Sequence, residues 1–115
     1  MADTIQIMAG ERRTVTITIR DTSANERLIR PFRCSSINFY MKNSLDQSVA
    51  ILYDAYLEEE ASEGYRITSG TLTAGNVTSQ KRIDEISPHP YINVTATAAG
   101  VSTSGTLLFD IYGVE

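Results

Sequence analysis

The residues that could perform chemistry in this chain are few, and the first of them is the single histidine, His89. A Ser/His/Asp or Cys/His mechanism needs a base that a third group orients and that reaches a nucleophile. His89 stands between Pro88 and Pro90, in a segment typical of a rigid turn. We therefore predict no catalytic residue, and a small hydrolase is the least favoured function.

Four glutamates crowd a second segment, where their oxygens could bind a hard cation such as Ca²⁺. They are Glu58, Glu59, Glu60 and Glu63. The segment lacks the alternating Asp or Asn residues and the glycine of a defined calcium loop. The sequence therefore favours a solvated acidic turn, and we predict no metal ion and no cofactor.

Cys34 is the only cysteine, so the chain can form no internal disulfide and must be stabilised by packing. Structural zinc needs three or four Cys, His or carboxylate ligands at close spacing, and one cysteine and one distant histidine do not supply them. The sequence also contains no glycine-rich phosphate-binding loop. Nucleotide chemistry is therefore not supported.

Two Asn-Val-Thr triplets, at 76–78 and 93–95, match the N-glycosylation acceptor. The N-terminus carries Asp3 in place of a basic region and has no long apolar run, so we predict no standard export signal. Chance therefore explains both triplets better, and Asn93 falls inside a predicted strand.

Six of the nine aromatic residues are tyrosines, whose large faces and polar tips suit a sugar-stacking or protein-contact surface. Tryptophan, the strongest sugar platform, is absent. Placement in the core or at a strand edge is the simpler interpretation of each tyrosine. They are Tyr40, Tyr53, Tyr56, Tyr65, Tyr91 and Tyr112.

The net charge of −4 argues against nucleic-acid binding, which needs a basic surface to displace counterions from phosphates. Residues 1–33 carry a net charge of +2 and residues 34–115 a net charge of −6, so one end of a copy could attract another. Ordinary scatter of surface charge is the simpler explanation. The longest apolar stretches fall far short of the ~20 residues that cross a bilayer, so we predict no membrane span.

Alternation of apolar and polar residues is the strongest structural pattern and predicts strands. Residues 13–20 place Val15, Ile17 and Ile19 on one face, with threonines on the other. Residues 4–8 continue this alternation, and the turn-forming segment between the two strands predicts a hairpin.

Further strands follow in the middle and at the end of the chain. In 36–41, Ile37, Phe39 and Met41 point inward, whereas 49–57 is apolar on both faces and is therefore predicted to be central or covered. The remaining predicted strands are 65–74, with a bulge or bend at Gly70, 91–98 and 106–114.

The segment 79–86 lacks alternation and is predicted to form one short helical turn. Ile83 and Ile86 are three residues apart behind a possible helix cap at Ser79. About seven short strands separated by turns then predict a single all-β domain over 1–115. We expect an antiparallel β-sandwich, Ig-like or jelly-roll-like, with a closed barrel as the alternative.

Three stretches resemble small β-sandwich structural proteins of tailed-phage virions: residues 10–21, residues 37–44 followed by 49–52, and, at the end, 91–96 with 104–108. The resemblance implies a structural role in capsid decoration, in head–tail joining, or in the tail or baseplate. It also implies symmetric oligomers, other virion proteins as partners, and a location in the virion or, before assembly, in the cytoplasm of the bacterial host. It assigns no functional residue.

We therefore expect a non-enzymatic structural protein that forms homo-oligomers through strand edges or hydrophobic faces. The outer face of 49–57 and the N-terminal hairpin are the candidate contact surfaces. The alternative is a carbohydrate- or cell-surface-binding module that uses its tyrosines and the acidic turn 58–63, with Ca²⁺ as a possible ligand of that turn.

Overall fold

The computed structural model describes residues 4–56, 64–75, 77–84 and 91–114, and these residues form nine strands and no helix. The strands are β1 (Thr4–Met8), β2 (Arg12–Ile17), β3 (Asn25–Phe32), β4 (Ser36–Asn43), β5 (Val49–Tyr56), β6 (Tyr65–Leu72), β7 (Val77–Ile83), β8 (Tyr91–Ala98) and β9 (Leu107–Val114).

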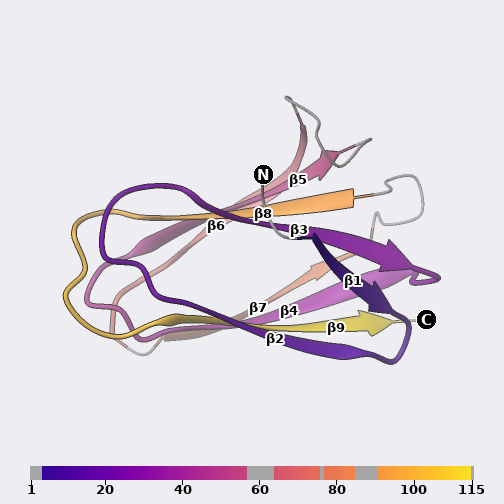
Figure 1. Ribbon diagram of the computed structural model, residues 1–115, viewed down its shortest axis with the longest axis horizontal. Coiled ribbons are helices and arrows are strands. Elements are labelled where there is room, and N and C mark those ends of the chain that lie inside the picture. The colour runs from indigo at the N-terminus through magenta and orange to yellow at the C-terminus, as the bar shows by residue number, and fades with distance from the viewer. Residues whose placement is uncertain (1–3, 57–63, 76, 85–90, 115) are drawn as a thin grey trace.

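The strands form two sheets that lie face to face (Figure 1). One sheet has five strands in the order β1-β3-β8-β5-β6, and the other has four in the order β2-β9-β4-β7. Every pairing is antiparallel except that of β1 with β3, which is parallel. The predicted β-sandwich is therefore confirmed.

The core lies between the two sheets, where the inward side chains of each strand are buried. The predicted inward residues Ile37, Phe39 and Met41 of β4 are all buried. The Phe39 ring packs against the Tyr53 ring of β5, with 5.2 Å between the ring centroids. Alternation predicts this burial because successive side chains of a strand point to opposite faces of its sheet.

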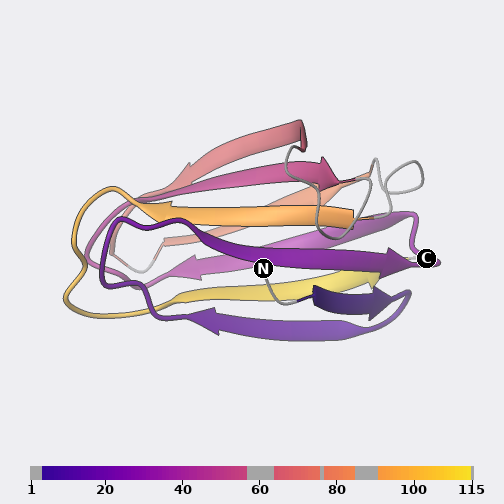
Figure 2. The same cartoon turned by 45° about the horizontal axis from the view of Figure 1, so that its top comes forward.

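The predicted N-terminal hairpin is wrong, because its two strands belong to different sheets. β1 pairs with β3 and β2 pairs with β9. Gly10, at φ +83°, donates a hydrogen bond to the carbonyl of Gly113, and this turn carries the chain from one sheet to the other (Figure 2). The alternation located both strands but contained no information about their partners.

The predicted helical turn at 79–86 is also wrong where it is described, because Val77–Ile83 forms strand β7 along β4. Both faces of most of this edge strand are exposed, so its residues lack the alternation that marks a half-buried strand. The sequence prediction also missed β3. Pro31 lies beyond the end of the β3–β8 pairing at Ile29 and pairs with Ile7 of β1.

β5 is central, as predicted, since it lies between β8 and β6. Its outer face is only half-buried, and Ala50 there is exposed. The predicted irregularity of β6 exists but is not at Gly70, which lies directly opposite Ile51. The extra residue is Ile67, because Tyr53 pairs with Thr68 and the next residue of β5 pairs with Arg66.

Two glycines provide a matched test of the backbone. Gly105 has φ +84°, and a Cβ atom there would lie 2.0 Å from the carbonyl oxygen of Ser44, whereas a Cβ atom at Gly70 would meet nothing within 4 Å. We expect Gly105→Ala to lower the free energy of unfolding by about 1–2 kcal/mol or more. Gly70→Ala should leave that energy unchanged or raise it by up to about 1 kcal/mol. Urea unfolding measures both, and equal effects would contradict this interpretation.

Candidate binding surfaces

Several residues singled out in the sequence lie outside the described residues: His89, the acidic turn 58–63, and Asn76. Within the described parts of the chain, no three His, Cys, Asp or Glu residues are grouped so that they could hold a metal ion. The same parts contain no helix that is long and apolar enough to span a bilayer.

Cys34 and Asn93 are in poor positions for chemistry. The Cys34 thiol is half-buried and faces the carbonyl oxygens of Ile7 and Phe32 at 3.6 and 3.5 Å, and burial raises its pKa, which disfavours the reactive thiolate. The Asn93 side chain is only 2% exposed in β8, which keeps it from a glycosylating enzyme.

The tyrosines divide among different surfaces. Tyr53 belongs to the core, where its hydroxyl donates to Met41 Sδ at 3.1 Å and burial raises its pKa. Tyr40 and Tyr112 lie on the outer face of the four-stranded sheet, and both are exposed, by 44% and 40%. Tyr56 and Tyr91 are paired on the outer face of the other sheet.

We call the outer face of the four-stranded sheet the tyrosine face. The strand register places its residues in three rows of four, one from each strand. Tyr40 and Tyr112 occupy neighbouring rows on adjacent strands, within reach of one another. The rows are Arg12, Tyr112, Asn38 and Arg82; Thr14, Asp110, Tyr40 and Gln80; and Thr16, Leu108, Lys42 and Thr78.

A shallow groove of about 460 Å³ runs over the second and third of these rows on the tyrosine face. Tyr40 and Leu108 give it an apolar floor, and its polar groups come from side chains that include Lys42, Gln80 and Asp110. The volume falls within the range of about 300–1,000 Å³ that is typical of ligand sites.

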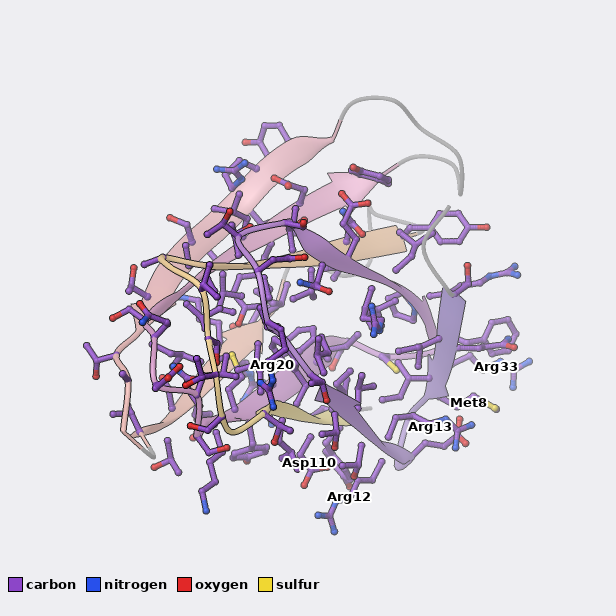
Figure 3. The ribbon with its side chains drawn as sticks, turned by 60° about the vertical axis from the view of Figure 1, so that its left-hand side comes forward. Met8, Arg12, Arg13, Arg20, Arg33 and Asp110 are labelled. Carbon is purple, nitrogen blue, oxygen red and sulfur yellow. The ribbon has the colours of Figure 1, made fainter. Side chains whose placement is uncertain are left out.

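Asp110 is held in place by Arg12 on the neighbouring strand (Figure 3). Arg12 Nε donates to Asp110 Oδ1 at 2.7 Å and Arg12 Nη2 donates to Oδ2 at 2.5 Å, a two-pronged ion pair that fixes the carboxylate. The hydrogen bond from Arg12 lowers the pKa of Asp110, so this group remains a hydrogen-bond acceptor in weak acid.

A second opening, which we call the edge cleft, lies between the edge strands β6 and β7 and measures about 230 Å³. Its floor is formed by the buried side chains of Met41, Ile51 and Tyr53. The cleft exists because the inward positions at its rim are occupied by Gly70 and Ser79, which are too small to cover the core.

The outer face of the five-stranded sheet is largely engaged in its own interactions. Asn93 Nδ2 lies 3.4 Å from each of three oxygens, those of the Glu26 carboxylate, the Tyr56 hydroxyl and the Thr95 hydroxyl. Arg66 forms an ion pair with Asp54 on the adjacent strand. The predicted contact surface on β5 is therefore interrupted by polar and charged groups.

Comparison with known proteins supports the fold alone. No protein-family model matches the chain, and no curated protein sequence matches it either. A pre-peptidase C-terminal domain of collagenase from Bacillus anthracis has a TM-score of 0.52 and 5% identity, with 97% of this chain and 95% of that chain covered.

Two further solved structures are similar. A structure described as CBM4, a carbohydrate-binding module, has a TM-score of 0.51 and 11% identity over 89% of this chain and 70% of that one. A protein of Bacillus endospore appendages, described as disulfide-linked pili, has a TM-score of 0.51 and 14% identity over 91% and 88%. All three confirm a β-sandwich.

The Arg12–Asp110 pair predicts a pH dependence of stability. Because the pKa of Asp110 is lowered in the folded state, its ionised form stabilises the fold above its unfolded pKa of about 3.9, and this contribution is lost as the pH falls. Asp110→Asn should flatten the loss of unfolding free energy below about pH 5, measured by urea titration. Arg12→Met should have the same effect because it removes the group that lowers the pKa. Unchanged slopes in both variants would contradict the assignment.

Proposed function

We propose that this protein is a non-enzymatic structural protein that works by oligomerisation. The main support is that strands β6 and β7 end the two sheets on the same side of the sandwich, so neither has a further strand partner among the described residues. The free backbone groups of an edge strand can pair with another chain, and assemblies use such edges deliberately.

The two other sheet edges are less suited to pairing. β2 begins with Arg12 and Arg13, and charged side chains protect an edge strand from association. β1 is five residues long, and short edge strands are protected in the same way. The contrast favours contact through the opposite side of the sandwich.

The setting that we propose is a large bacterial or viral particle or fibre. The resemblance to tailed-phage virion proteins supports a phage particle, and the similar fold of a protein of disulfide-linked pili is consistent with a fibre. Its partners would then be copies of itself and other structural proteins, with no nucleic acid and no membrane, and it would reside in the virion or the host cytoplasm.

Light scattering tests the assembly directly. We expect a discrete closed oligomer at micromolar concentration that dissociates in the double variant Thr71→Lys, Thr78→Lys, because each copy then carries added like charges on β6 and β7. The matched control is Thr16→Lys on the opposite edge strand β2, which should leave the mass unchanged. A strict monomer at all concentrations would contradict the proposed function.

A second candidate function, carbohydrate binding, is supported by the groove on the tyrosine face. An exposed tyrosine ring can stack on the apolar face of a sugar, and the surrounding Lys42, Gln80 and Asp110 supply donors and acceptors for its hydroxyl groups. The similar fold of a carbohydrate-binding module is consistent with this use of the face.

Titration with cellohexaose and chitohexaose, followed by NMR amide shifts, tests the second candidate. Tyr40→Ala should weaken binding about tenfold, equivalent to 1.4 kcal/mol, because the stacking surface is lost. The control is Phe32→Ala, which removes an exposed ring from the other sheet and should leave the affinity unchanged. No shift with either hexasaccharide would exclude the groove as a site for such chains.

A further inference from the structure

The edge of β6 is the most open of the four sheet edges. The one charged residue of β6, Arg66, forms an ion pair with Asp54 of β5, and from Ile67 to Leu72 the strand carries no charge. Its middle residues Ser69, Gly70 and Thr71 are small, so its backbone is accessible. An incoming extended segment gains main-chain hydrogen bonds from such an edge, and pockets for its alternate side chains give specificity.

β7, on the other side of the edge cleft, is protected. Lys81 pairs with Phe39 and therefore shares the inner face of the sheet, at the rim of the cleft. An inward-pointing charge is one of the features by which natural edge strands avoid pairing, and Arg82 adds a second charge to the same strand. We conclude that β6 is the better acceptor of the two.

The edge cleft also has the size of a single aromatic ring. Its volume is about 230 Å³, whereas an apolar cavity of about 150 Å³ already binds benzene. Gly70 is the position where its wall is missing, because a side chain there would point inward beside Ile51 and meet no atom within 4 Å. An aromatic side chain on the strand that pairs with such an edge glycine covers the residues that the glycine leaves exposed.

Tyr65, at the start of β6, has the matching position. It is 67% exposed and pairs with Ala55, so it belongs to the same inner face as Gly70. Ile67 is the extra residue of the bulge and has no partner on β5, so it is not counted along the strand pairing. Counted by paired positions, Tyr65 lies two positions before Thr68 and Gly70 lies two positions after it. The partners on β5 confirm the count, since Ala55 and Ile51 flank Tyr53 by two residues each.

We propose that two copies of this chain pair through β6, antiparallel, around a two-fold axis at Thr68. Opposite residues of an antiparallel pair share a face, so this register places Tyr65 directly across from the partner's Gly70, and does so twice. Each tyrosine ring then covers the edge cleft of the other copy. This inference rests on the proposed assembly and specifies its first contact.

Cysteine cross-linking tests the register, in a Cys34→Ser background that removes the native thiol. At the axis the two copies of residue 68 are directly opposite, about 4.5–5.5 Å apart between Cα atoms, which suits a disulfide. Thr68→Cys should therefore give a covalent dimer on mild oxidation. Thr71→Cys, three ladder positions from the axis, is the matched control and should remain uncrosslinked.

Two further variants test the ring and the cleft. Tyr65→Ala should weaken dimerisation at least tenfold in analytical ultracentrifugation. Gly70→Val should do the same while keeping or raising the melting temperature, because it fills the cleft without backbone strain. Full dimerisation in both variants would overturn the proposed contact.

The outcomes separate this inference from the proposed function. An oligomer seen by light scattering without the Thr68→Cys cross-link, or with a stronger Thr71→Cys cross-link, would overturn the β6 pairing and leave assembly intact. A monomer at every concentration would contradict both. The Thr68→Cys cross-link, together with dissociation of the Gly70→Val variant, would support both.

Discussion

The contact between the inner faces of the two sheets is the interaction on which the rest of the structure depends. Phe39 of β4 meets Tyr53 of β5 across this interface, and Ile37 and Ile51 are buried beside them. The chain has a single cysteine, and its buried hydrophobic side chains form one cluster between the sheets, so apolar packing stabilises the fold. Strands such as β4, β5 and β9 therefore give one side of their alternation to the core, and outer faces and edges remain for function.

This constraint explains why the sequence predicted some elements and missed others. β4 lies between β9 and β7 and buries Ile37, Phe39 and Met41 on one face, so its alternation was clear. β7 buries little besides Ile83, and its polar residues carried no such pattern. The N-terminal hairpin failed for a different reason: alternation shows which face is buried, but a strand's partners depend on the whole topology.

The candidate surfaces were predictable only in part. Composition identified Tyr40 and Tyr112 as available aromatic residues, but their positions in neighbouring rows follow from pairings between strands far apart in sequence. The edge cleft was still harder to predict, because it requires two small residues on different sheets, Gly70 of β6 and Ser79 of β7, to lie on opposite sides of the same opening. The sequence predicted a bulge or bend at Gly70, whereas in the structure Gly70 leaves a gap at the rim of the core.

The two proposed surfaces are physically compatible, because they belong to different sheets. Pairing through β6 extends the five-stranded sheet and leaves the outer face of the four-stranded sheet uncovered. A two-fold axis perpendicular to the joined sheet keeps both four-stranded layers on the same side of it. The two tyrosine faces of the dimer then point in a common direction.

A repetitive polysaccharide or a regular particle surface could engage both faces at once, and the second contact would form at the high effective concentration set by the first. Assembly through the edge and recognition through the face would in this way reinforce each other.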